Sequence, residues 1–162
     1  MNLTAKLLSL PPFAAKSRDV HVIVDTPPGF TPEVIASIDS SSHVCMVGML
    51  DSLSLKNTKL GLDTLELMGY SPERVRLVLN RADSRVGITH DDVLAVVGHM
   101  PDVFVPSDRD IPRSINEGEP IVRAKTKSEA AKAFRSLASM YDGHPAGHLN
   151  GGRKRSRLRK KG

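Results

Sequence analysis

The sequence has little of several features that define other classes of protein. It has one cysteine, Cys45, and no tryptophan. A lone thiol excludes an internal disulfide framework and fits a reducing compartment. No apolar run approaches the roughly 18 residues of a membrane-spanning helix, and Pro11-Pro12 breaks the short apolar patch near the N-terminus, so we expect no signal peptide. The six histidines lack metal-site spacing.

Glycine is absent from the first part of the chain. The first glycine is Gly29, and no Gly-Lys dipeptide occurs anywhere in the 162 residues. Phosphate-binding loops need glycines whose backbone N–H groups surround the phosphates, and a lysine that neutralises them. The sequence therefore predicts that this polypeptide has no such loop.

Positive charge is concentrated at the C-terminus. The formal charge is +5, but seven of the 23 basic residues lie in residues 153–161, and without them 16 basic residues face 18 acidic ones. We interpret residues 143–162 as a flexible basic tail that binds anionic phospholipid, binds nucleic acid phosphates without specificity, or is simply solvated. The basic residues of the tail are Arg153, Lys154, Arg155, Arg157, Arg159, Lys160 and Lys161.

Apolar runs alternate with helical patterns between the N-terminal extension, residues 1–18, and the tail. This order predicts an α/β domain over residues 19–142, with a parallel sheet covered on both faces and right-handed crossovers. The expected strands are residues 19–25, 43–48, 74–80 and 103–105. The expected helices begin near residues 32, 52, 89 and 126.

Three details of these elements are specific enough to be checked. We expect Cys45 to be buried as a small hydrophobe in its strand. Thr126 and Glu129 have the spacing of a capping box before the last helix. The second helix is expected to face the core through its apolar stripe, which consists of Leu53, Leu60, Thr64, Leu67 and Met68.

The first expected strand ends in a candidate metal site. Asp25 is followed by Thr26, Pro27, Pro28 and Gly29. An aspartate at the carboxyl end of a parallel strand points to where ligands of α/β folds bind, and Mg²⁺ prefers oxygen ligands. The alternative is an ordinary turn after a strand.

A second group of candidate residues follows the later strands. Asn80 and Arg81 end one strand, and Pro106 and Asp108 follow the next. An asparagine amide offers a donor and an acceptor together, which suits an adenine edge, but an asparagine also caps turns. In residues 116–120, the glycine and proline favour a structural role, with a positive φ at Gly118.

Three stretches carry a family resemblance: VHVIVDTPPGF, VRLVLNRAD and VFVPSDRDIPRSINEGEPIV. In this order, over about residues 20 to 141, they resemble the second half of the MinD/ParA-like P-loop ATPases, in particular the CpaE-like pilus-assembly branch. The resemblance implies a partial P-loop NTPase fold and the cofactors ATP and Mg²⁺. It implies that Asn80, with Arg81 beside it, recognises adenine, and that Pro106 and Asp108 line and close the base pocket. Asp25 would hold Mg²⁺ through water, and residues 25–29 would form a switch II-like segment.

The missing phosphate loop separates the chain from this family. Phosphoryl transfer depends on positioning and charge stabilisation, so we expect weak or no ATP hydrolysis from this chain alone. Without the strand of that loop, apolar strand edges would stay exposed. The sequence thus predicts either a truncated product or a chain whose sheet is completed by another chain.

Three functions follow from the resemblance. The first is spatial positioning of bacterial pilus-assembly or cell-division machinery by an ATPase-family protein that is truncated here. The first alternative is a non-catalytic interaction module that docks on an intact ATPase or another partner, and the second is an adenine-nucleotide sensor. Expected partners are a second copy or an intact family ATPase. The expected location is the cytoplasm, with the tail offering peripheral contact to the inner face of the plasma membrane.

Overall fold

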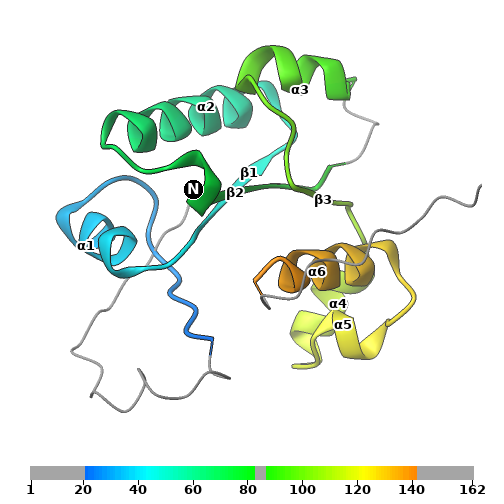
Figure 1. Ribbon diagram of the computed structural model, residues 1–162. Coiled ribbons are helices and arrows are strands. Elements are labelled where there is room, and N and C mark those ends of the chain that lie inside the picture. Colours follow the sequence, from blue (N-terminus) through cyan, green and yellow to red (C-terminus); the bar gives the residue numbers. More distant parts are fainter. Residues whose placement is uncertain (1–20, 83–86, 142–162) are drawn as a thin grey trace, which may run out of the picture.

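Three parallel strands form the centre of the computed structural model, which describes residues 21–82 and 87–141. They are β1 (Val44–Met49), β2 (Val75–Asn80) and β3 (Val103–Val105), in the order β1-β2-β3 (Figure 1). Val44 lies opposite Val75, and Val78 lies opposite Val103. The parallel α/β sheet predicted from the sequence is confirmed for these three strands.

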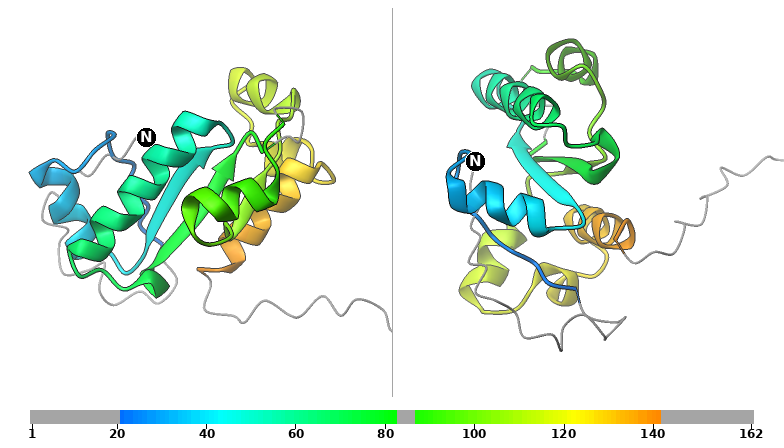
Figure 2. Two further views of the ribbon diagram at one scale, coloured as in Figure 1. Left: turned by 90° about the horizontal axis from the view of Figure 1, so that it is seen from above. Right: turned by 60° about the vertical axis from the view of Figure 1, so that its left-hand side comes forward.

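Helices connect the strands and cover the sheet. The elements are α1 (Pro32–Ser40), α2 (Ser52–Leu67), the 3-10 helix η1 (Pro72–Arg74), α3 (His90–Val97), α4 (Asp110–Asn116), α5 (Ile121–Ala124) and α6 (Glu129–Ser139). Figure 1 shows α2 and α3 on one side of the sheet and α4 to α6 on the other, and Figure 2 confirms these layers from two further directions. No helix in the described part of the chain is long and apolar enough to cross a membrane.

The core has two parts, one on each side of the sheet. The larger part joins α1, α2 and α3 to β1 and β2 and includes Val34, Leu55, Leu77, Leu79 and Val93, which are at most 1% exposed. The smaller part lies under α6 and consists of buried Val78, Val103 and Val105 with half-buried Ala133, Phe134, Leu137 and Met140. Leu77 and Val78 point to opposite sides because successive side chains alternate along a strand.

Local signals in the sequence set most helix ends. Asp51 caps α2 by accepting a hydrogen bond from the Ser54 N–H at 2.8 Å, and Gly69, predicted to stop this helix, has a φ of +82°. Gly118 has the predicted positive φ, +69°. The capping box predicted at residues 126–129 is wrong: Ser128 caps α6, and Glu129 is already its first residue. A complete capping box occurs instead at the start of α3.

The strand predicted over residues 19–25 is not formed in the described part of that range. Residues 21–25 are extended, belong to no strand and are exposed, with Val22, Ile23 and Val24 being 55%, 91% and 38% accessible. Figure 1 shows this dark-blue segment leading to α1 outside the sheet. The physical reason is the absence of a neighbour: in residues 21–82 and 87–141, β1 pairs with β2 alone, and no strand lies between β1 and this segment.

One face of β1 is also uncovered, which corrects two further expectations. Residues along β1 alternate between buried and exposed, with Cys45, Val47 and Met49 on the exposed face. Cys45 is therefore not the buried residue that we predicted, and the sheet is not covered on both faces at β1. The cause is the position of α6, whose apolar face packs on the Val78, Val103 and Val105 cluster of β2 and β3.

The apolar stripe predicted for α2 faces solvent. Leu53, Leu60 and Leu67 are 70%, 66% and 88% exposed, whereas the residues of α2 that face the core are Leu55, Thr58, Gly61 and Leu65. Leucines occur on two faces of this helix, so periodicity alone could not decide between them. The Asp51 cap and the short connection from β1 fix which face meets the sheet.

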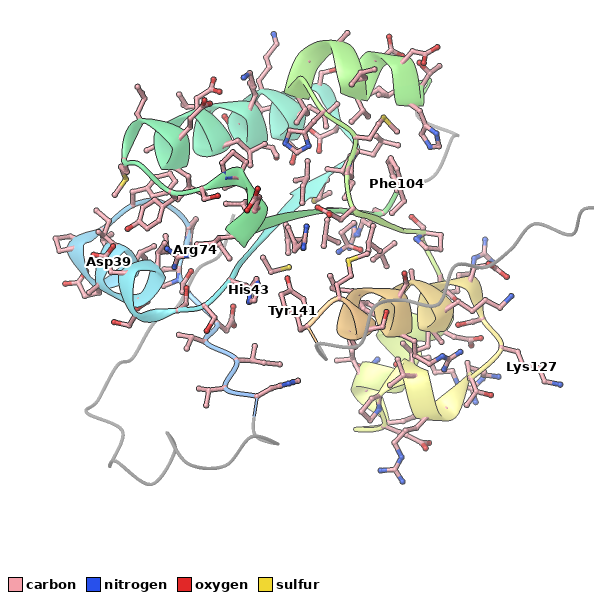
Figure 3. The ribbon with its side chains drawn as sticks, viewed as in Figure 1. Asp39, His43, Arg74, Phe104, Lys127 and Tyr141 are labelled. Carbon is pink, nitrogen blue, oxygen red and sulfur yellow. The ribbon has the colours of Figure 1, made fainter. Side chains whose placement is uncertain are left out.

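Arg74 ties the end of α1 to the start of β2. Its guanidinium donates to the carbonyl oxygens of Ser41 at 2.5 Å, Ser42 at 3.3 Å and Ile38 at 3.4 Å. It also lies over the Tyr70 ring, 5.7 Å from the centroid, and the Tyr70 hydroxyl donates to Asp39. Arg74 and Asp39 are labelled in Figure 3. A cation at the last carbonyls of a helix also complements the helix dipole.

Tyr141 anchors the end of the described chain near β1. Its ring meets His43 edge to face, with centroids 5.5 Å apart, just before β1 begins (Figure 3). Burial raises the pKa of the Tyr141 hydroxyl. The N-terminal extension, residues 1–18, and the basic tail, residues 143–162, lie outside the described residues.

Candidate functional site

Asn80 and Arg81 lie at the carboxyl end of β2. The Asn80 side-chain oxygen accepts a hydrogen bond from the Arg81 backbone N–H at 2.9 Å. Arg81 has a φ of +52°, and it is the one non-glycine residue of the described chain with a positive φ. Asn80 therefore performs the turn-capping role that the sequence left open. The same bond fixes its side chain at the edge where ligands of parallel α/β sheets bind.

Pro106 is brought to this edge by the pairing of β2 with β3. Asn80 lies opposite Val105, the residue before Pro106, and the pairing extends one step further because the Ala82 N–H donates to the Val105 carbonyl at 3.0 Å. Asp108 lies in the following loop, where its side chain accepts from the Asp110 N–H at 2.8 Å. The sheet thus brings the ends of β2 and β3 together, whereas Asp108 is oriented by the start of α4.

An open hollow of about 480 Å³ lies beside this edge. It is lined by Ala82, Phe104, Pro106, Glu129, Lys132, Ala133 and Ser136. Phe104 stacks on His90 with ring centroids 4.5 Å apart and an interplanar angle of 24°, and Figure 3 shows it below α3. The first turns of α6 form the other wall, where Lys132 pairs with Glu129 at 2.5 Å.

This arrangement suits a flat heteroaromatic ring. Ala82, Phe104 and Pro106 supply apolar and aromatic surface, and ligand sites combine such surface with a few polar groups that fix orientation. Lys132 and Glu129 supply a polar ion pair at the rim. Sequence reasoning found Pro106 but missed the wall on α6. A usable signal was present, because Glu129, Lys132, Ala133 and Ser136 recur at the three- and four-residue spacing of one helix face.

The Asp25–Gly29 segment is not part of this edge as a strand end. Asp25 is exposed in the extended segment before α1. Thr26, by contrast, is buried at 5% exposure, and its hydroxyl donates to the Pro27 carbonyl at 3.4 Å. Gly29 has a φ of +103°, a conformation that suits glycine. The expectation that Asp25 ends a sheet strand is therefore wrong for this chain by itself.

The donor set fits Mg²⁺ only in part. In residues 21–82 and 87–141, no group of three or more histidine, cysteine, aspartate or glutamate side chains is placed to hold a metal. Asp25 offers one accessible carboxylate, which suits a water-mediated contact because Mg²⁺ keeps several of its waters. The remaining ligands would have to come from nucleotide phosphates and from other protein groups.

Comparisons with known proteins give one curated relative and several solved structures. No family model matches the chain. The curated relative is the putative septum site-determining protein MinD of Nephroselmis olivacea, 25% identical over 151 residues, which cover 90% of this chain and 54% of that protein.

Solved structures of three MinD proteins share the fold. The cell-division ATPase MinD of Pyrococcus furiosus is 26% identical with a TM-score of 0.60, over 71% of this chain and 48% of that one. MinD of Pyrococcus horikoshii, complexed with Mg-ADP, is 25% identical with a TM-score of 0.62, over 74% and 49%. MinD of Aquifex aeolicus is 19% identical with a TM-score of 0.65, over 76% and 53%.

All these matches cover a similar share of the relatives. The chain spans about half the length of the proteins it matches. Its three parallel strands and flanking helices are a partial P-loop NTPase fold. In sequence and in fold, the chain is a relative of the MinD/ParA-like P-loop ATPases.

Proposed function

We propose that this polypeptide supplies the base-binding half of a MinD/ParA-like nucleotide site, and that by itself it hydrolyses ATP weakly or not at all. The observation that carries the proposal is the shared end of β2 and β3, where Pro106 lines an open hollow and Asn80 ends the neighbouring strand. No Gly-Lys dipeptide is available in these 162 residues to hold phosphates. Positioning and charge stabilisation supply most of phosphoryl-transfer catalysis, so this half alone lacks the larger share.

The base would occupy the hollow against Phe104 and Pro106. The amide of Asn80 would read the adenine edge, with Arg81 beside it and Asp108 closing the pocket. Asp25 would contact Mg²⁺ through water, and Thr26, Pro27, Pro28 and Gly29 would respond to the γ-phosphate. A relative in complex with Mg-ADP, the MinD of Pyrococcus horikoshii, is consistent with these assignments.

The uncompleted sheet supports a further part of the proposal, that another polypeptide completes the sheet and the nucleotide site. Ile23 is 91% exposed, and Val47 and Met49 on β1 are 50% and 42% exposed. In the described chain β1 is the outer strand and pairs on one side only, and an unpaired strand edge beside exposed apolar residues marks a site where another strand adds. One inserted parallel strand would pair with β1 and give residues 21–25 the neighbour they lack. It would also carry Asp25 to the carboxyl edge of the sheet.

The cellular role follows from the relatives. A curated relative is a putative septum site-determining protein, and one solved MinD forms a MinC:MinD complex. These relatives support the proposal that the chain acts in spatial positioning of division machinery or, through the CpaE-like resemblance, of pilus-assembly machinery. Contact of the basic tail with anionic lipid would place it at the membrane surface.

The alternative is a non-catalytic module that docks on an intact ATPase. The exposed face and the outer edge of β1 favour it as much as they favour sheet completion, because either partner would cover this side of β1. The two functions differ in what the resulting complex binds. A completed site binds ADP with a dependence on Mg²⁺, whereas a docked module leaves the nucleotide affinity of its partner unchanged.

Co-purification with a homologous polypeptide that carries the phosphate loop tests both functions. We expect a complex that is lost when Val47 and Met49 are both changed to lysine. It should be retained in Ile115→Lys, since Ile115 is an apolar residue that is 71% exposed on α4, outside β1. Mg²⁺-dependent ADP binding by this complex would establish the completed site. A complex with no gain in ADP binding would favour the module, and the absence of any complex would contradict both.

A further inference from the structure

Helix α2 carries an apolar stripe that the fold does not use. Leu53, Leu60 and Leu67 recur every seven residues and are 70%, 66% and 88% exposed. At 100° per residue, a seven-residue repeat returns to within about 20° of the same direction, so the three side chains form one line. Figure 2 shows α2 along the outside of the molecule.

This stripe points away from the sheet. The core residues of α2, Leu55, Thr58 and Leu65, lie on the opposite side of the helix from Leu60. A strand that completes the sheet beside β1 would therefore not bury the stripe. An explanation of these leucines has to come from a different contact.

The spacing of the stripe is symmetric about Leu60. If two copies of α2 lie antiparallel with Leu60 against Leu60, then Leu53 of each copy meets Leu67 of the other. Helices in antiparallel bundles cross at about 20°, a shallow angle at which all three leucines of one copy can meet those of the other. Such an isologous contact closes as a two-fold dimer.

Charges beside the stripe obey the same symmetry. Lys56 and Asp63 lie on the same flank of the stripe, the flank opposite to that of Asn57 and Thr64. In the antiparallel pair, Lys56 of one copy and Asp63 of the other differ in position along the helix axis by the rise of a single residue. The two-fold symmetry gives two such Lys56–Asp63 pairs. Within one copy, the Lys59 Nζ atom lies 2.6 Å from the Asp63 carboxylate. The Asp63 side chain is still 41% exposed, so it remains accessible to a second cation.

We propose that α2 forms a two-fold symmetric, antiparallel dimer contact between two copies of this chain, centred on Leu60. The 16-residue helix is about 24 Å long, so the contact is smaller than a standard interface of about 800 Å² per partner. The dimer is accordingly reversible and depends on concentration. It uses neither the nucleotide edge nor the free edge of β1, so it stands or falls independently of the proposed function.

Sedimentation equilibrium of the full 162-residue chain, without nucleotide, tests the dimer. Between about 1 μM and about 1 mM, a range that covers weak association, the average mass should rise from 17.6 kDa towards twice that value. Leu60→Glu places two like charges on the axis and should keep the chain monomeric. Ile115→Glu, an exposed apolar residue on α4, is the matched control and should dimerise like the parent.

Charge reversal and cross-linking test the register. Lys56→Asp alone and Asp63→Lys alone should each weaken the dimer, and the double variant should restore it. In a Cys45→Ser background, a short thiol cross-linker should join two Leu60→Cys chains. Leu53→Cys chains should cross-link to Leu67→Cys chains but not to each other. A chain that stays monomeric throughout, or a dimer that survives Leu60→Glu, would overturn the proposal.

Discussion

Asn80 and Val105 lie opposite each other across the parallel pair β2–β3, so that the Asn80 side chain and Pro106 reach the same edge of the sheet. Asn80 and Pro106 are 26 residues apart in the sequence, and only the register of the sheet brings them together. Neither side chain alone specifies a ligand. The base-binding interpretation rests on their shared edge and on the adjoining hollow, which Phe104 and Pro106 line.

Replacing Asn80 tests its role towards adenine. In the complex with a phosphate-loop partner, Asn80→Ala should lower the affinity for ADP about tenfold, which corresponds to the ~1.4 kcal/mol of a hydrogen bond at the upper end of the usual range. Calorimetry on the complex measures this. Asn116→Ala, an exposed asparagine on α4, should leave the affinity unchanged. An Asn80→Ala complex that binds ADP as tightly as the parent would show that Asn80 only caps its turn.

Gly48 is required by close packing between β1 and α2. A Cβ at this position would lie 2.5 Å from the Thr58 hydroxyl and 3.1 Å from a methyl group of Leu79. Gly48→Ala should therefore lower the free energy of unfolding by about 1–3 kcal/mol, as overpacking does. Denaturant titration measures the loss.

A double-mutant cycle identifies the atom responsible. Adding Thr58→Ala removes the hydroxyl group and should recover part of the stability lost in Gly48→Ala, because the two residues are in contact. Strictly additive effects of the two substitutions would contradict a clash between them.

Arg74 should contribute to stability well beyond an ordinary surface arginine. Arg74→Ala removes donors to three carbonyl oxygens at the end of α1 and the contact with Tyr70. We expect a loss of about 1–3 kcal/mol, the usual effect of removing hydrogen bonds to a charged group. Thermal unfolding should show no comparable loss for Arg123→Ala, an exposed arginine in α5. Equal effects of the two substitutions would argue against this role.

The capping box of α3 should make stability depend on pH in acid. The Thr89 hydroxyl, and then the Thr89 backbone N–H, donate to the Asp92 carboxylate and hold its pKa below the usual value. A folded pKa below the unfolded one stabilises the protein above the unfolded pKa, and this stabilisation is lost as the pH falls through the folded pKa.

Melting temperatures recorded between neutral pH and about pH 3 check this dependence. Asp92→Asn should flatten the acid side of the curve, whereas Asp91→Asn, the neighbouring carboxylate, should retain the slope of the parent. An unchanged slope in Asp92→Asn would show that other carboxylates control the acid response.

Much of the fold was predictable because it depends on local signals. The strands β1, β2 and β3 follow from their apolar runs. The helix ends follow from residues within a few positions of them, namely the Asp51 cap and the glycines at 69 and 118. The failures concern contacts with distant neighbours. Residues 21–25 have a strand sequence but no strand to pair with. Cys45 is exposed because α6 packs on β2 and β3 and leaves that face of β1 largely open.

The candidate site divides in the same way. Asn80, Arg81 and Pro106 could be predicted as candidates because each lies at or directly after the end of a predicted strand. Lys132 and Ser136 were missed because their place in the hollow depends on how α6 lies beside β3, which no local pattern specifies. In α2, six leucines fall on two faces, and the choice between the faces follows from the tertiary connection to β1.

Calorimetric titration of the purified chain with ADP and ATP, with and without Mg²⁺, tests the central claim most directly. A base-binding half without a phosphate loop should show no Mg²⁺-dependent binding while circular dichroism confirms that it is folded. Micromolar, Mg²⁺-dependent binding by this chain alone would mean that it builds a complete nucleotide site, and would contradict the account.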